Sequence, residues 1–299
     1  MRWISRVTIA MNSTAIVFSN NDLSSVQRIY PILHKSALDQ IIWAVDGDRS
    51  IPDFILSHNS KTDIVSYSQI RLGKSNAYNR ALKLIQNENV FLVSADITFD
   101  SSIFQAILER IEDHGLAITN VTQVRQNGLI RKVGCLLWCI RDIQLRYFSE
   151  NGIPIHGGEF LYIKRKFLER LPEVVNDDAY QCLIAQKNGA RGVYFGDLEV
   201  KNFVPSTLTD LIQQRRRINY GHIQIGKKLE KPSSVSFMVL NNTGGTLAIF
   251  KKTLKRNKRW ALIFPILILI EIIAKLSAYI DVMTSHDQIL WKNIETSKS

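Results

Sequence analysis

The fold is decided by Ile41-Ile42-Trp43-Ala44-Val45, an unbroken apolar run that ends at the polar turn Asp46-Gly47-Asp48. A second run, Val90-Phe91-Leu92-Val93, ends in the same way at Ser94-Ala95-Asp96. Shorter runs at 15–18 and 63–67 predict two more strands, and segments with helical spacing of apolar residues separate the four. Continuous apolar strands separated by helices are typical of a parallel sheet covered on both faces. We therefore predict an α/β fold with a mostly parallel central sheet flanked by helices.

Acidic residues stand where the predicted strands end. In open α/β sheets the ligand lies beyond the carboxyl ends of the strands, and Asp46, Asp48 and Asp96 all fall there. Each also has a simpler interpretation, because Asp-Gly is common turn chemistry and an aspartate can cap a helix. A Rossmann dinucleotide site is excluded, since no Gly-x-Gly-x-x-Gly follows the first strand.

The remaining elements are predicted from spacing alone. A helix begins at Leu23, and Pro31 should end or kink it. Residues 116–138 have a mixed pattern and are expected to hold strands that return to the sheet. Further helices are predicted at 76–85, 103–111, 178–187 and 208–221, a strand–helix unit at 159–171, and short strands at 192–195 and 198–200.

The charge of the chain points to an anionic partner. The 299 residues carry a net charge of +11, with a pI near 9.6. Six of the basic residues form one block directly before the most apolar segment, which favours a membrane surface over nucleic acid: Lys251, Lys252, Lys255, Arg256, Lys258 and Arg259. The three cysteines, at 135, 139 and 182, lack metal-site spacing and are expected to be free thiols. No secretory signal is expected in 1–11.

The apolar segment at 260–280 predicts a helix of roughly 30 Å, about the thickness of the hydrocarbon core of a membrane. Glu271 interrupts it, and a charge there costs about 3 kcal/mol in a membrane-spanning helix, although Lys275 is spaced to pair with it. A spanning helix and a helix lying in the membrane interface both remain open. The basic block would face the cytoplasm in either case. The predicted division is a catalytic domain at 1–225, a basic linker at 226–258, the membrane-associated helix at 259–283 and a tail at 284–299.

Three further motifs carry residue types suited to phosphate or proton-transfer chemistry. Asp177 and Asp178 are adjacent carboxylates, so one could act as a general base, or both could simply complement a helix dipole. Gly73-Lys74 precedes a predicted helix start that could hold phosphate. Gln214 and the arginines at 215–217 suit a diphosphate, although at least one of the arginines is expected to be plain surface. His222 is expected to be a packed histidine rather than a metal ligand.

In their order, these motifs resemble those of the family 2 glycosyltransferases of GT-A fold, from residue 14 to about 221. The resemblance implies that Asp178 is the catalytic base, with Asp177 in place of the family's glutamate. It implies a divalent cation, Mg²⁺ or Mn²⁺, on Asp96, with Ser94 departing from the family's Asp-x-Asp. It places Gly157 and Gly158 on the acceptor side, and these residues at the donor nucleotide: Asp46, Asp48, Lys74, Asn79, Gln214, Arg216 and Arg217. Ile218 replaces the tryptophan of Gln-x-x-Arg-Trp, which argues against a processive polysaccharide synthase.

The implied function is that of an inverting glycosyltransferase at the cell membrane, with a cytoplasmic catalytic domain. It would use a nucleoside diphosphate sugar and a lipid-linked or membrane-proximal glycan acceptor, with no nucleic-acid partner. Two alternatives are a nucleotidyltransferase, which would normally carry a Gly- and Arg-rich loop where this chain has Asn20-Asn21-Asp22, and an inactive anion-binding protein of the same fold.

Overall fold

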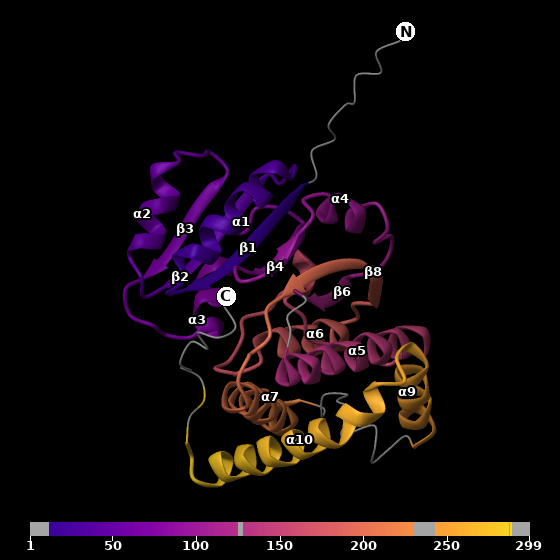
Figure 1. Cartoon of the computed structure of the whole chain (residues 1–299). Coiled ribbons are helices and arrows are strands. Elements are labelled where there is room, and N and C mark those ends of the chain that lie inside the picture. The colour runs from indigo at the N-terminus through magenta and orange to yellow at the C-terminus, as the bar shows by residue number, and fades with distance from the viewer. Residues whose placement is uncertain (1–11, 125–127, 230–242, 287, 289–299) are drawn as a thin grey trace.

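The structure is a computed structural model that describes residues 12–124, 128–229, 243–286 and 288. Within these ranges the centre of the molecule is an eight-stranded sheet of order β3-β2-β1-β4-β7-β6-β8-β5 (Figure 1). Its strands are β1 (Ser13–Asn20), β2 (Gln40–Asp46), β3 (Asp63–Ser68), β4 (Asn89–Ser94), β5 (Thr98–Phe99), β6 (Leu116–Gln123), β7 (Phe160–Lys164) and β8 (Gly192–Asn202).

The first half of the sheet is parallel. Strands β3, β2, β1 and β4 run in one direction, and Val17 on β1 pairs with Trp43 on β2 and with Val93 on β4. This register brings the carboxyl ends of the strands, at Asn20, Asp46 and Ser94, to one edge. Strand β7 runs antiparallel to both β4 and β6, while β8 is parallel to β6. The predicted α/β fold with a mostly parallel sheet is confirmed.

Helices cover both faces of the sheet. On β1, Ala15 and Val17 point into one apolar core and Ile16 and Phe18 into the other, as the two-residue period of a strand requires. Helices α1, α2 and α4 pack on the first face, and α3, α5, α6 and α7 on the second. The helix bounds are α1 (Leu23–Lys35), α2 (Ser50–Ser57), α3 (Lys74–Leu82), α4 (Ile103–Leu108), α5 (Leu129–Glu150), α6 (Asp177–Lys187), α7 (Leu208–Lys228), α9 (Thr243–Arg256) and α10 (Trp260–Met283), with a 3₁₀ turn η1 (Arg165–Phe167).

Three predicted elements differ from the structure. The mixed region 116–138 contains one strand, β6, and then the start of the long helix α5, whose buried residues Val133, Leu136, Ile140 and Ile143 follow helical spacing. The two short strands predicted within 192–200 are one strand, β8. Of the two outcomes expected at Pro31, an end of helix α1 is wrong: the helix continues, because that residue is exposed and water can bond the carbonyl that its missing N–H leaves unpaired.

The C-terminal helices form an outer layer over α5 and α7 (Figure 1). Helix α10 lies along α7, and its inward residues are buried at helical spacing: Ile263, Leu267, Ile270, Ala274, Ala278 and Asp281. Among the described residues, α10 is the one helix long and apolar enough to cross a membrane. The region predicted as a basic linker, 226–258, contains the end of α7 and the helix α9, which packs on α5.

Ion pairs fix this outer layer. Arg216 on α7 donates two hydrogen bonds to Asp281 on α10, one of them from Nε at 2.6 Å. Asp142 on α5 accepts a hydrogen bond from the Tyr194 hydroxyl at 2.7 Å and lies 2.6 Å from Nη1 of Arg256 on α9. Helices α9 and α10 are therefore parts of the folded domain and are not attached to it by apolar contacts alone.

Candidate active site

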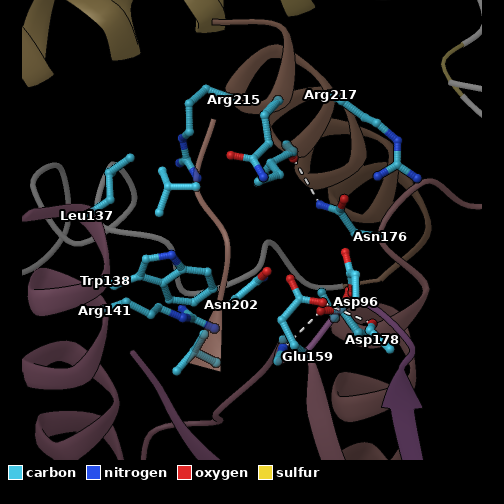
Figure 2. A pocket seen from close by; sticks show the side chains of 18 of the residues that line it. Asp96, Leu137, Trp138, Arg141, Glu159, Asn176, Asp178, Asn202, Arg215 and Arg217 are labelled. Atoms are coloured by element: carbon cyan, nitrogen blue, oxygen red, sulfur yellow. Dashed lines mark hydrogen bonds between the residues drawn. The ribbon is translucent and has the colours of Figure 1, made fainter. Parts of the chain in front are cut away.

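A cavity of about 820 Å³ opens at the carboxyl ends of β1, β2 and β4. Its other walls come from α5, α6, α7 and α10. Figure 2 shows its two ends, with Trp138 at one and Asp96, Glu159 and Asp178 at the other. We name these the aromatic end and the acidic end.

At the acidic end, the backbone positions Asp178. Its Oδ2 accepts a hydrogen bond of 2.9 Å from the N–H of Gly158. Gly157 and Gly158 have φ angles of +77° and +148°, which side chains rarely permit. A Cβ at Gly157 would also lie 3.0 Å from Nη2 of Arg141 and 3.5 Å from Oδ2 of Asp178. The two glycines therefore allow the backbone to approach the Asp178 carboxylate closely, and the Gly158 N–H holds that carboxylate in one orientation.

The start of α6, which carries Asp177 and Asp178, rests against α7. Asn176 donates from Nδ2 to the carbonyl oxygen of Ile218 at 2.9 Å. Gly221 lies so close that a Cβ there would be 2.4 Å from Cγ of Asn176. The position of the paired carboxylates thus depends on a helix that carries the arginines of the same cavity.

Lys74, the first residue of α3, lies among carboxylates. Its Nζ is 3.3 Å from Oδ2 of Asp177 and 5.0 Å from the centre of the Phe18 ring. Burial acts to lower the pKa of Lys74, but the charges of Asp177, Asp178 and Glu159 outweigh it and raise that pKa. The ammonium group is therefore permanently charged at neutral pH.

Asp96 and Glu159 supply oxygen ligands suited to a hard cation. Ser94 donates a hydrogen bond of 3.0 Å to Oε2 of Glu159. Burial, followed by the charge of Asp96, raises the pKa of Glu159 to about 7. Burial also raises the pKa of Asp96, against the opposing charge of Lys74. Buried carboxylates that resist ionisation together are stabilised by a bound cation, and Mg²⁺ and Mn²⁺ prefer such oxygen ligands. Among the described residues, no group of three or more acidic, histidine or cysteine side chains could hold a metal alone, so donor oxygens would have to complete this site.

Helix α7 turns its successive arginines in different directions, because each residue advances about 100° around the axis. Gln214, Arg215 and Arg217 line the cavity, whereas Arg216 points to Asp281. Figure 2 shows Arg215 on the side of Trp138 and Arg217 on the side of Asp178. Burial lowers the pKa of Arg217, although the nearby charges of Asp177 and Asp178 oppose the shift. Arg217 is thus the α7 cation that faces the acidic end.

Most of the predicted site residues meet in the cavity. Those that line it are Asp46, Lys74, Asp96, Gly157, Gly158, Asp177, Asp178, Gln214 and Arg217. Asp46 is buried there, receiving hydrogen bonds from Arg80 at 2.6 Å and from the backbone N–H of Leu72 at 3.1 Å.

Asp48, Asn79 and Arg216, which were also predicted at the donor nucleotide, lie outside the cavity lining. Asp48 accepts hydrogen bonds from the backbone and hydroxyl of Ser50 at the start of α2. Asn79 exchanges two hydrogen bonds of 2.8 Å with the backbone of Leu171. Arg216 is engaged by α10, while Arg215, which was not among the predicted site residues, lines the cavity and pairs with Glu271.

Several cavity residues were missing from the prediction. Trp138 and Arg141 come from α5, and Trp138 is the last residue of the region 116–138 that was expected to hold strands. Arg141 donates to the carbonyl oxygen of His156, and burial lowers its pKa. Glu159 directly follows Gly157-Gly158, which were predicted to lie at the site, so its position in the sequence could have identified it as a site residue.

The aromatic end has an apolar wall. Helix α10 contributes Phe264, Leu267, Ile268 and Ile272 to the cavity lining, opposite Trp138 of α5. His222 also faces this end, where burial and the charges of Arg215 and Arg141 lower its pKa to about 3. It is neutral at physiological pH, as expected for a packed histidine. The cavity therefore joins the acidic end to an end where apolar side chains of α10 lie beside the Arg215–Glu271 ion pair.

Comparison with known proteins identifies the architecture. The sequence profile of the family described as glycosyltransferase like family 2 matches residues 60–221, more than half of the chain. No curated protein sequence matches significantly. The structure is similar to that of a mannosyltransferase from Pyrobaculum calidifontis in complex with GDP-Man and Mn²⁺, with a TM-score of 0.57, 16% identity, and 92% of this chain and 88% of that chain covered. It is also similar to glucosyl-3-phosphoglycerate synthase from Mycobacterium tuberculosis, with a TM-score of 0.50, 15% identity, and 69% and 78% covered.

Proposed function

The chain belongs to glycosyltransferase like family 2, the family that its motifs resembled, and on this premise we propose that it is an inverting transferase that uses a nucleoside diphosphate sugar. The acceptor in this proposal is a lipid-linked or membrane-proximal glycan. The main support for the proposed transferase activity is the position of Asp178. This carboxylate lines the same cavity as the cations Lys74 and Arg217 and as the apolar side chains of α10.

The donor would occupy the acidic end, with its nucleoside at the strand-end edge that includes Asp46. The mannosyltransferase of similar fold was determined with GDP-Man and Mn²⁺, which supports both a nucleotide sugar and a divalent cation here. When bound, Mg²⁺ or Mn²⁺ would neutralise charge on the diphosphate leaving group. Arg217, whose donors face the same end, would stabilise that charge as the glycosidic bond to phosphate breaks. Asp96 would hold the cation.

Asp178 would act as the general base. The Gly158 N–H binds Oδ2 and fixes the plane of the carboxylate, so that Oδ1 can accept the proton of the acceptor hydroxyl. That hydroxyl attacks the anomeric carbon from the side opposite the diphosphate, which inverts the configuration. Lys74 lies 3.3 Å from the neighbouring Asp177, and its charge opposes the rise that burial causes in the pKa of that carboxyl. A general base of this kind contributes roughly 10²- to 10⁴-fold to a rate.

The acceptor would enter from the aromatic end, along α10. The outward face of α10 exposes a row of large apolar side chains, among them Leu262 at 79% and Met283 at 83%, while α9 and the turn before α10 expose lysines and arginines. This combination suits an anionic membrane surface. Because the opposite face of α10 packs along α7 and lines the cavity, an interfacial position on the cytoplasmic leaflet agrees better with its contacts than a transmembrane one. If α10 crossed the membrane away from α7, Asp281, which is 1% exposed, would lose its ion pair with Arg216.

A screen of nucleoside diphosphate sugars with Mn²⁺ or Mg²⁺ tests the proposal. We expect one donor to raise the melting temperature and to yield a nucleoside diphosphate when an acceptor-containing membrane extract is added. Asp178→Asn should keep the donor-dependent shift and lose at least 100-fold in product formation. Turnover by Asp178→Asn at the wild-type rate would refute the assignment of the base, and the absence of any stabilising donor would refute the proposed function.

A further inference from the structure

We propose that Glu159 supplies the carboxylate that Ser94 lacks, so that Glu159 and Asp96 together hold the divalent cation. The inference rests on the proposed function, since that function brings the cation to this cavity. It concerns a residue that the motif pattern does not include, because Glu159 directly precedes β7, whereas the Ser94-Ala95-Asp96 segment follows from β4.

The pairing of β4 with β7 places Glu159 opposite Ser94. The two strands are antiparallel, with Val93 across from Phe160 in the last registered pair. The next position on β4 is Ser94, and the next on the β7 side is Glu159. The N–H of Ser94 donates to the carbonyl oxygen of Glu159 at 3.0 Å, which continues the ladder by one pair. Side chains at opposed positions of such a ladder are direct neighbours.

The side chains of these two residues meet as their backbones do. The Ser94 hydroxyl donates to Oε2 of Glu159 at 3.0 Å. The glutamate carboxylate thus lies against the side chain of position 94, in the space that a longer acidic side chain at that position would occupy. A short hydroxyl on one strand and a long carboxylate on its neighbour place one negative charge at this point, as an aspartate at position 94 would.

Asp96 and Glu159 lie at the same end of the cavity. Both line the acidic end of the cavity, where Figure 2 shows their side chains together beside Asp178. The negative charge of Asp96 acts on Glu159. Lys74 offsets part of that charge, but its direct ion pair is with Asp177. The Ser94 hydroxyl engages one oxygen of Glu159, and a divalent cation between Asp96 and Glu159 would be bound by the carboxylate oxygens that remain.

Mn²⁺ binding tests this assignment without any donor. The full-length protein is titrated with Mn²⁺ alone, and free Mn²⁺ is followed by its electron paramagnetic resonance signal. We expect Glu159→Gln to weaken Mn²⁺ binding at least tenfold. The matched control is Glu173→Gln, which removes the same charge from an exposed residue outside the cavity and should leave the affinity within twofold of wild type.

A rescue variant separates a ligand from a structural residue. Ser94→Asp in the Glu159→Gln background moves the carboxylate to the opposite strand and should restore Mn²⁺ affinity to within threefold of wild type. Thermal unfolding of each variant identifies any that fail to fold, and Glu159→Ala combined with Ser94→Asp gives a second version of the rescue. Wild-type affinity in folded Glu159→Gln, failure of both rescues, or no Mn²⁺ binding by the wild type would overturn the proposal.

The outcomes also distinguish this inference from the proposed function. Loss and rescue of Mn²⁺ binding in a protein that no nucleotide sugar stabilises would support the cation site and contradict the sugar transfer. Sugar transfer at wild-type metal dependence in Glu159→Gln would support the function and remove Glu159 from the site.

Discussion

The ion pair between Arg216 and Asp281 attaches α10 to α7, and breaking it should destabilise the domain measurably. Asp281 is 1% exposed, whereas the Arg216 side chain is 35% exposed. Two hydrogen bonds join the guanidinium to the carboxylate, and Gln288 donates a third to Asp281 at 3.0 Å. Asp281→Asn keeps the shape of the side chain and removes its charge, and Arg216→Gln removes the partner.

The structure gives the size of each effect. Breaking a buried ion pair from one side costs roughly 3–5 kcal/mol when the remaining charge has no access to water. Arg216 has partial access, so Asp281→Asn should cost about 2 kcal/mol in the free energy of unfolding. Arg216→Gln leaves a buried carboxylate without its cation and should cost about 3 kcal/mol. We expect a coupling energy near 2 kcal/mol in the double-mutant cycle.

Urea denaturation in mild detergent measures this cycle without the screening that a guanidinium salt would introduce. The control cycle is Arg49–Asp53, an ion pair four residues apart whose side chains are 66% and 60% exposed. Its coupling should be about 0.3–0.5 kcal/mol. If the Arg216–Asp281 coupling is no larger than that of Arg49–Asp53, the reasoning that α10 is held by a buried charge is refuted.

Three further predictions concern pH, packing and membrane binding. Burial lowers the pKa of His222 to about 3 from an ordinary 6.5, so the stability that its neutral form contributes above pH 6.5 is lost as the pH falls toward 3. His222→Asn should therefore remove about 2 kcal/mol of the difference in unfolding free energy between pH 7 and pH 5, as measured by urea denaturation midpoints. A variant with the same pH dependence as the wild type would contradict the burial of neutral His222. The added Cβ of Gly221→Ala would overlap the Asn176 side chain and displace it, so this variant should lose about 1–3 kcal/mol in unfolding free energy and most of its turnover. Full activity would show that the start of α6 is not fixed by α7. Leu269→Glu, on the outward face of α10, should weaken binding to vesicles that contain anionic lipid by about tenfold. The control is Leu56→Glu on α2, where the leucine is similarly exposed, and it should leave vesicle binding unchanged. Equal losses in the two variants would contradict the specific role of α10.

The parallel half of the sheet could be predicted because its strands are apolar on both faces. The runs that end at Asp46 and Ser94 are fully apolar, which is typical of strands covered on both faces of a sheet. The position of the ligand-binding edge could therefore be inferred from the residues that follow these strands. Helix α5 could not be recognised in the same way. Its buried positions from Val133 to Phe148 alternate with half-buried ones that line the cavity, including Trp138 and Arg141, and this blurs the apolar period on which the prediction depends.

The candidate site was predictable where its residues adjoin a strand end or helix start, and it was missed where it depends on long-range pairing. Asp178 begins a helix and Asp96 follows a strand, so local pattern was sufficient for both. The partnership of Ser94 and Glu159 depends on the register of β4 against β7, which joins residues 65 positions apart. Similarly, the pairing of Arg215 with Glu271 and of Arg216 with Asp281 depends on how α10 docks, and it joins residues 56 and 65 positions apart.

Helix α7 places three adjacent arginines against three different partners, and this arrangement limits how the gene can change. Arg215 meets Glu271, Arg216 meets Asp281, and Arg217 faces the acidic end. Inserting or deleting a single codon between Leu208 and Gln214 would rotate the arginines by about 100° relative to everything upstream. Each guanidinium would then face the wrong partner, although no residue of the site had been replaced. Point substitutions should therefore be tolerated across the exposed positions of this segment, while its length should be fixed.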